Sequence, residues 1–192
     1  KIKKKIEKNM KNYPVNNKPF PFALSRTTSE QEKQLATKKD TLKTMKPTPD
    51  APQGFARKVI IGTNVVESSV TFYDPLVYVI ETGLAYEKIY DAKNYCYNTG
   101  KFEISQASID QRCGRTGRTC EGTCFQLYRD ADFAHLEKFT PPKILQEDLT
   151  GDFLNIIIMP MNGNLQKGLE FLSRMIEPPK NYQPAIYRAY NN

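Results

Sequence analysis

Short apolar runs rich in β-branched residues recur along the chain between polar turns. Runs of this kind are typical of strands that are buried on both faces of a parallel sheet. The segments that we interpret as strands are 22–24, 58–61, 77–80 and 124–128. They alternate with helical stretches and therefore predict an α/β domain, in which helices flank a parallel sheet.

Apolar residues at helical spacing mark the stretches between and after these strands. Ile2, Ile6 and Met10 lie four residues apart on a lysine-rich segment, which predicts an amphipathic helix. Capping hydroxyls at 27–29 predict a second helix that ends near residue 37. The other helices that we predict are 105–122, 144–159 and 165–176, with Pro178-Pro179 ending the regular structure.

Two segments do not follow either pattern. Residues 38–54 are mostly lysine, threonine and proline, which predicts a loop or insertion. Residues 84–106 alternate aromatic and polar side chains and predict an exposed β-hairpin that reverses at 98–100. Hairpin tyrosines can stack on nucleic-acid bases, but they more often pack across the strand pair.

Length and composition limit the class of protein. The 192 residues with 39% hydrophobic content fit one globular core plus some flexible length. The longest apolar run, 153–159, is far shorter than the roughly 18 residues that a membrane span needs. The amino end lacks the apolar stretch of a secretory signal. We expect a monomeric intracellular protein of the cytoplasm or nucleus, with no membrane segment.

The cysteines do not suggest a metal site. Cys96, Cys113, Cys120 and Cys124 lack CxxC spacing, and His135 is the single histidine of the chain. We therefore expect no bound metal and four reduced thiols in structural positions.

The net charge of +7 is concentrated at one end. Residues 1–46 carry 13 Lys and Arg against 4 Asp and Glu, whereas the rest of the chain carries 15 against 17. A basic segment can attract nucleic-acid phosphates, but charge runs are also common on solvated helix faces.

The string QRCGRTGR, residues 111–118, carries the most specific chemistry. On the predicted helix, Arg115 and Arg118 lie three residues apart on one face, where two guanidinium groups can hold a transferring γ-phosphoryl group. The two glycines allow another backbone to approach closely. A solvated arginine-rich helix face would not require both glycines.

These residues resemble motif six of the DEAH-box and related viral superfamily-two RNA helicases, where it lies in the second RecA-like domain. TNVVESS, residues 63–69, is similar to motif five of the family, and 77–83 and 122–128 are similar to the strands that follow motifs five and six. The resemblance covers about residues 20–180. It implies a RecA-like domain over 1–140 and a helical connector over 141–192, which leads toward a winged-helix region.

The resemblance also implies a role for each matched residue. In the nucleotide site, Gln111 positions the attacking water, Arg115 contacts the γ-phosphate and Arg118 acts as the arginine finger. The residues expected on the nucleotide side are Ser69, Thr71 and Arg112, the last at least partly structural. The residues expected to hold RNA are Ser25, Thr63 and Asn64. The hairpin is expected to stand beside the RNA path.

The sequence departs from the family in several places. No GxxxxGK[ST] phosphate loop and no DExx motif occurs in the 192 residues. We therefore expect ATP and Mg²⁺ to be held mainly by a first RecA-like domain outside this sequence, and this chain to be inactive alone. Leu35 replaces a base-stacking phenylalanine, Leu24 a glycine and Glu81 an aspartate.

Three functions remain open at this point. The chain can be the C-terminal motor domain of an NTP-dependent RNA helicase, with DNA left open as a further partner. The helicase can be cellular or from a large DNA virus, in which case the virion is a further location. The chain can instead be a non-catalytic helicase-like scaffold that binds RNA, although intact Gln111, Arg115 and Arg118 argue against this. It can also be an interaction domain that uses the 38–54 insertion, although no motif in the sequence supports this function.

Overall fold

The computed structural model describes residues 1–91, 93–158 and 164–174. The chain divides into two compact units, one formed by 1–86 and 102–139 and the other by 87–101 and 140–192. All residues that we predict to bind nucleotide or RNA lie in the first unit. Within the described ranges, no helix combines the length and apolar character that crossing a lipid bilayer requires.

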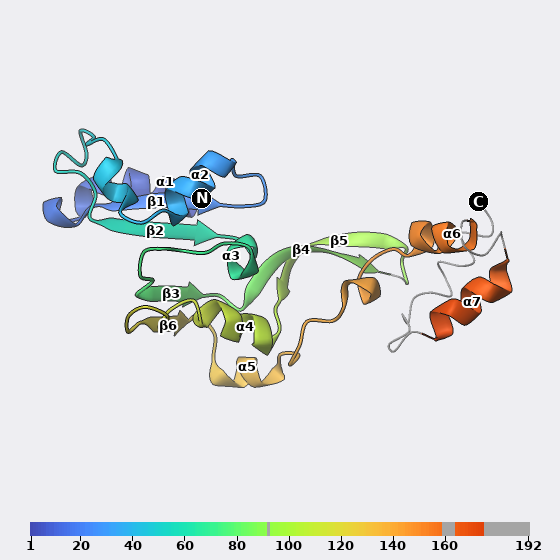
Figure 1. Ribbon diagram of the computed structural model, residues 1–192. Helices are drawn as coiled ribbons and strands as arrows, with labels where there is room; N and C mark the ends of the chain where they lie inside the picture. Colours follow the sequence, from blue (N-terminus) through green and yellow to red (C-terminus); the bar gives the residue numbers. More distant parts are fainter. Residues whose placement is uncertain (92, 159–163, 175–192) are drawn as a thin grey trace. The chain divides into compact units, whose positions relative to one another are not determined.

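The first strand pair joins β1 (Pro19–Leu24) and β2 (Arg57–Gly62) in parallel, with Leu24 opposite Gly62. The core of this part is formed by Phe22, Leu24 and Ala36. Ala36 belongs to α2 (Glu30–Thr37), whose first turn is capped by the hydroxyl of Ser29. Ahead of β1 lie α1 (Ile2–Lys8), η1 (Met10–Asn12) and η2 (Val15–Asn17) (Figure 1). The amphipathic pattern predicted one helix that carries Ile2, Ile6 and Met10, whereas the structure divides it into α1 and η1; η2 was not predicted.

The segment predicted as a loop, 38–54, contains one short 3-10 helix, η3 (Thr41–Thr44). Thr41 is buried and Leu42 packs against the core, so the segment is anchored by its own side chains. Polar contacts also anchor the segment, because Lys58 Nζ donates to the Lys38 carbonyl at 2.9 Å and to Asp74 at 2.6 Å. The segment is therefore part of the folded unit.

The second strand pair joins β3 (Tyr78–Glu81) and β6 (Thr123–Gln126), again in parallel. Around it lie α3 (Val65–Ser68), α4 (Gln106–Cys113), which packs against β3, and α5 (Asp130–His135). The parallel strands and flanking helices confirm the predicted α/β fold.

The helix predicted over 105–122 is much shorter in the structure. It ends at Cys113, and residues 114–120 form turns and bends. The Thr116 hydroxyl donates to the Cys113 carbonyl at 2.9 Å, and Arg118 Nε donates to the Gly114 carbonyl at 3.1 Å. These side-chain bonds satisfy carbonyls that a continuing helix would use, and the positive φ of 72° at Gly117 turns the backbone away.

The predicted hairpin is confirmed, but its reversal is not at 98–100. The strands are β4 (Leu84–Asp91) and β5 (Cys96–Glu103), so 98–100 lies inside a strand. The reversal follows Asp91, whose Oδ1 accepts from the backbone N–H groups of Lys93 at 2.9 Å and Asn94 at 3.2 Å. Tyr90 and Tyr97 pack across the pair with ring centroids 5.1 Å apart, which favours the structural interpretation of these tyrosines.

After the hairpin, the second unit contains η4 (Lys143–Leu145), α6 (Thr150–Ile158) and α7 (Leu165–Ser173). The helix predicted from residue 144 begins only at Thr150, because the Asp148 carboxylate accepts from the Thr150 N–H at 3.1 Å and from its hydroxyl at 2.7 Å. The predicted stop at Pro178-Pro179 lies outside the described residues.

Candidate nucleotide and RNA site

The three residues predicted to hold RNA meet at one edge of the β1–β2 pair. Ser25 follows β1, and Thr63 and Asn64 follow β2, because parallel strands end at the same side of a sheet. The Thr63 N–H donates to the Leu24 carbonyl at 3.1 Å, which fixes the two strand ends together. Thr63 and Asn64 are exposed, so this polar edge is open to a ligand.

The short helix α3 begins directly after this edge. It has four residues, and the two hydroxyl residues predicted on the nucleotide side, Ser69 and Thr71, follow it and are exposed. One turn of helix therefore separates the predicted RNA contacts from the predicted nucleotide contacts.

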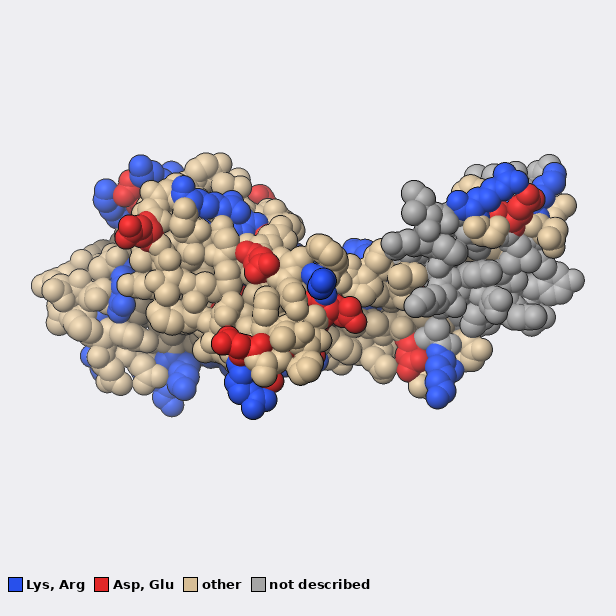
Figure 2. Space-filling view, turned by 90° about the horizontal axis from the view of Figure 1, so that it is seen from below, with Lys and Arg blue, Asp and Glu red and all other residues tan. Residues whose placement is uncertain are grey.

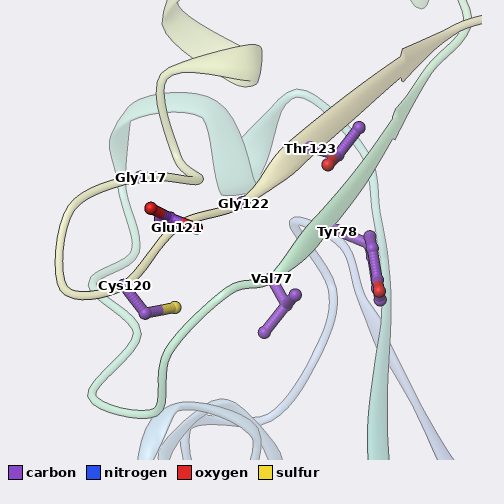
Figure 3. Close-up of a pocket in the computed structure, with 7 residues that line it drawn as sticks. All are labelled: Val77, Tyr78, Gly117, Cys120, Glu121, Gly122 and Thr123. Carbon is purple, nitrogen blue, oxygen red and sulfur yellow. The ribbon is translucent and has the colours of Figure 1, made fainter.

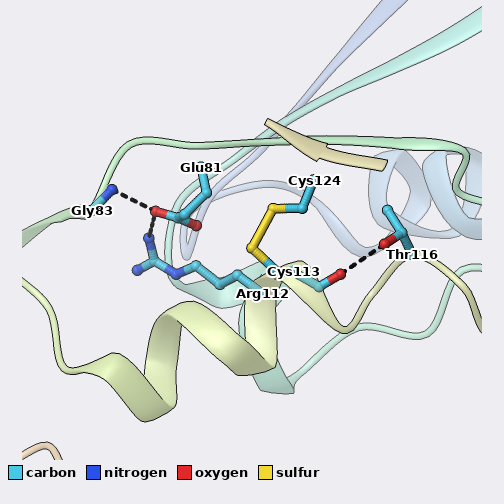
Figure 4. Close-up of a disulfide and its surroundings, with 6 residues drawn as sticks. All are labelled: Glu81, Gly83, Arg112, Cys113, Thr116 and Cys124. Carbon is cyan, nitrogen blue, oxygen red and sulfur yellow. Dashed lines mark hydrogen bonds and ion pairs between the residues drawn. A yellow bond between two sulfur atoms is a disulfide. The ribbon is translucent and has the colours of Figure 1, made fainter. Parts of the chain in front are cut away.

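Arg112, at the end of α4, is held by two carboxylates. Its Nε donates to Glu67 at 2.8 Å, and its Nη1 donates to Glu81 at 3.1 Å and to the Leu84 carbonyl at 3.1 Å. Glu81 Oε1 also accepts from the Gly83 N–H at 2.8 Å (Figure 4). The Arg112, Glu67 and Glu81 side chains are only 14%, 16% and 4% exposed. This is a buried ionic network that ties α3, α4 and β3 together.

Arg115 binds one backbone carbonyl of α3 and one of the segment that follows it. Its Nη1 donates to the Val70 carbonyl at 2.8 Å, and its Nη2 donates to the Glu67 carbonyl. Partial burial lowers the pKa of the Arg115 guanidinium and the nearby Arg118 charge lowers it further, whereas the Glu67 carboxylate acts in the opposite direction. Arginine stays charged at physiological pH, so the two guanidiniums repel each other.

Arg118 and Gln111 are exposed. Since α4 ends at Cys113, Arg115 and Arg118 do not share a helical face as we predicted; the turns after the helix bring them close enough for their charges to interact. Among the described residues, Arg118 forms no ion pair. Gly117 has open space around it, so its positive φ of 72°, and not a close backbone approach, accounts for this glycine.

A disulfide joins the end of α4 to β6. It links Cys113 to Cys124 with the two Cα atoms 5.4 Å apart, a usual separation for a disulfide (Figure 4). The expectation of four reduced thiols is therefore wrong for this pair, while Cys96 and Cys120 are free. The sequence could not show this pairing, because it depends on α4 lying beside β6.

An open hollow of about 730 Å³ lies beside the loop that follows Arg118 (Figure 3). Its lining residues come from this loop and from the starts of β3 and β6: Val77, Tyr78, Gly117, Cys120, Glu121, Gly122 and Thr123. The lining carries one carboxylate and no cationic side chain. It is therefore a poor match for a phosphate group.

The basic residues of the amino end have more than one role. Lys4, Lys5 and Lys8 of α1 are exposed, but Lys18 is buried and donates to the carbonyls of Met10 at 2.7 Å and Tyr13 at 2.6 Å. On the face shown in Figure 2, Lys and Arg side chains are scattered among acidic and neutral ones. In the described part of the chain, no three His, Cys, Asp or Glu side chains gather as metal ligands would.

The structure thus places the predicted residues in one unit and bonds Arg112 and Arg115 to Glu67 and Val70. It adds two residues that the prediction did not assign. Glu67 and Glu81 each pair with Arg112. Glu67 lies within the TNVVESS string, and Glu81 was noted only as a substitution. Arg112 lies 45 residues from Glu67 and 31 residues from Glu81, so both pairings are tertiary contacts, which a single sequence does not reveal.

The chain is similar in fold and in sequence to proteins of the DExH-box class. The chain is similar to the crystal structure of the DExH-box NTPase HrpB of E. coli, with a TM-score of 0.66 and 25% identity, over 88% of this chain and 19% of that one. No family model matches the chain.

The relatives found by sequence are DExH-box ATP-dependent RNA helicases, and over the matched residues the chain is homologous to them. It is 35% identical over 125 residues to a protein of Acanthamoeba polyphaga mimivirus that carries the name ATP-dependent RNA helicase L540. It is 34% identical over 128 residues to DExH2 of Arabidopsis thaliana and 36% over 125 residues to the ATP-dependent DNA/RNA helicase DHX36 of Homo sapiens. These matches cover 65%, 67% and 65% of this chain but only 18%, 8% and 12% of the relatives.

Proposed function

We propose that this chain is the second RecA-like domain of an ATP-dependent RNA helicase and that it supplies the arginine finger, Arg118. The observation that carries the proposal is the contrast in partners among the three arginines of the motif. Arg112 is held by two carboxylates and Arg115 by two carbonyls, whereas Arg118 is exposed, forms no ion pair among the described residues and donates from Nε to the Gly114 carbonyl of its own loop. An exposed guanidinium on an anchored loop suits contact with a phosphate that a neighbouring domain holds.

The charges near Arg118 support an anion as the ligand. Burial is the main cause of the lowered pKa of Arg115, and the Arg118 charge lowers that pKa further, so the two guanidinium charges interact. A phosphate oxygen beside the two guanidiniums would relieve this repulsion. Arg118 has the greater freedom to turn toward it, because the Arg115 guanidinium is already bonded to two carbonyls.

In this proposal ATP with Mg²⁺, held mainly by a first RecA-like domain, supplies the γ-phosphoryl group that is transferred to water. Arg118 stabilises the negative charge that develops on that group, and Gln111 orients the attacking water. Ser69 and Thr71 lie on the same nucleotide side. Ser25, Thr63 and Asn64 hold RNA phosphates at the polar edge of β1 and β2.

Hydrolysis by the separate parts tests this function. Purified chain with ATP, Mg²⁺ and RNA should show no turnover above background, because it has no phosphate loop in its sequence. A protein that joins it to a phosphate-loop domain should hydrolyse ATP faster when RNA is added. Turnover by the chain alone would contradict the assignment.

RNA binding provides a second arm of the same test. Binding by the chain alone should be weak and steeply salt-dependent, because few phosphate contacts come from this domain. Tight binding that salt does not weaken, together with no hydrolysis by the joined protein, would favour the scaffold function instead.

A further inference from the structure

Glu67 contacts two arginines of the 111–118 motif through two different groups. Its carboxylate accepts from Arg112 Nε at 2.8 Å, and its main-chain carbonyl accepts from the Arg115 guanidinium. Arg115 also binds the Val70 carbonyl at 2.8 Å. The single turn α3 is therefore held to the arginine segment by its side chain and by its backbone.

The position of Glu67 in the chain gives these contacts their significance. It lies in α3, which follows the polar edge at Thr63 and precedes the hydroxyl residues Ser69 and Thr71. A four-residue helix has little stability of its own, since most helical stability in proteins comes from packing. The position of α3 thus depends on its hydrogen bonds with Arg112 and Arg115.

Glu81 offers an internal comparison, because it binds the same guanidinium. It accepts from Arg112 Nη1 at 3.1 Å and from the Gly83 N–H at 2.8 Å, and its side chain is 4% exposed. Glu81 belongs to β3 and fixes Arg112 to the sheet. Glu67 connects that fixed arginine to α3, the single turn that the proposed RNA and nucleotide contacts flank.

We infer that Glu67 is a positioning residue that transmits RNA binding to the arginine segment. The inference rests on the proposed function. RNA bound at Thr63 and Asn64 shifts the start of α3. The ion pair between Glu67 and Arg112 then makes α3 and the end of α4 move together. The carboxylate contacts neither RNA nor nucleotide; it acts through Arg112, at the end of α4, to set the place of the segment that carries Arg118.

The test uses Glu67→Gln in the full-length protein, with ATP hydrolysis measured at saturating RNA and without RNA. Glutamine keeps the shape of the side chain and removes its charge. The ratio of the two kcat values should fall about tenfold, the size of coupling that such networks carry. RNA affinity and hydrolysis without RNA should stay within about twofold of the wild type. An unchanged ratio would overturn the inference.

Two further variants separate positioning from mere support of the fold. Glu81→Gln removes the other carboxylate on Arg112, and it should lower the melting temperature and both rates while leaving their ratio unchanged. If it lowers the ratio as much as Glu67→Gln does, Glu67 has no special role. Glu67→Asp keeps the charge on a shorter side chain and should restore part of the ratio. If Glu67→Gln does not fold, a partial loss of the ratio in Glu67→Asp supports the inference and an unchanged ratio refutes it.

The failure of the proposed function would look different. A wild-type protein whose hydrolysis does not respond to RNA would remove the function and this inference together. A wild-type protein that responds, with Glu67→Gln responding equally, would remove the inference alone.

Discussion

Arg112 and Arg118 lie six residues apart in one string but in unlike surroundings. Arg112 closes α4, is 14% exposed and has two carboxylates within 3.1 Å. Arg118 lies in the loop beyond the helix and is exposed. A buried charge must be paired, whereas an exposed one is free to meet a ligand. The difference teaches that arginines of one motif can have different roles: Arg112 stabilises the site, whereas Arg118 is placed to contact a ligand.

The largest loss of stability is expected from Arg112→Ala. It leaves the buried Glu81 carboxylate and the partly buried Glu67 carboxylate without their partner, which costs up to about 3–5 kcal/mol. Thermal unfolding of the purified chain should therefore show a much lower melting temperature. Arg112→Lys keeps the charge but lacks the fork that reaches both carboxylates, so it should recover only part of the loss. If Arg112→Ala melts at the same temperature as the wild type, Arg112 does not stabilise the fold and the contrast with Arg118 is wrong.

A smaller loss is expected from Gly117→Ala, in the loop that carries Arg118. No atom lies within 4 Å of an added Cβ, so the cost comes from the positive φ alone and should be about 1 kcal/mol. Gly151→Ala is a matched control, because that glycine lies in α6 with equal space and alanine favours helix. Denaturant unfolding should show a loss for the first variant and none for the second.

The smallest effect is the loss of stability at low pH from the Lys58–Asp74 ion pair, with which the larger effect of the Arg112 network can be compared. Partial burial raises the pKa of Asp74, but the bonds from Lys58 and from the Asp40 N–H outweigh burial and hold that pKa below its ordinary value. The stability that this pair adds is therefore present above roughly pH 4 and is lost as pH falls below it.

Melting temperatures of the wild type and of Asp74→Asn measure this effect against pH. The two should differ at neutral pH and converge in acid. A difference that stays constant down to pH values below about 3 would show that the carboxylate charge is not involved.

Local signals predicted the elements well where the chain's own side chains form them. The Ser29 cap is local to α2 and the β-branched run at 58–61 is visible in the sequence alone, and both α2 and β2 lie where the pattern indicated. The end of α4 was missed because Thr116 and Arg118 bond back to helix carbonyls. The hairpin reversal was missed because Asn98-Thr99-Gly100 has turn composition, while the Asp91 side chain forms the actual turn.

The site was predicted as a set of residues but not as a structure. The motif identified Arg115 and Arg118, but their supposed helical face does not exist. The carboxylates that hold Arg112 come from α3 and β3, and the Cys113–Cys124 disulfide depends on α4 lying beside β6. Contacts of this kind follow from tertiary packing, so no local pattern in the sequence contains them.

The central claim is that Arg118 acts on the nucleotide, and its replacement by alanine in the full-length protein tests this most directly. A finger stabilises charge that develops only in the transition state. RNA-stimulated kcat should therefore fall by roughly 10³ or more, with RNA affinity and melting temperature close to those of the wild type. A variant that keeps most of its RNA-stimulated hydrolysis, or whose defect follows a lowered melting temperature, would contradict the account.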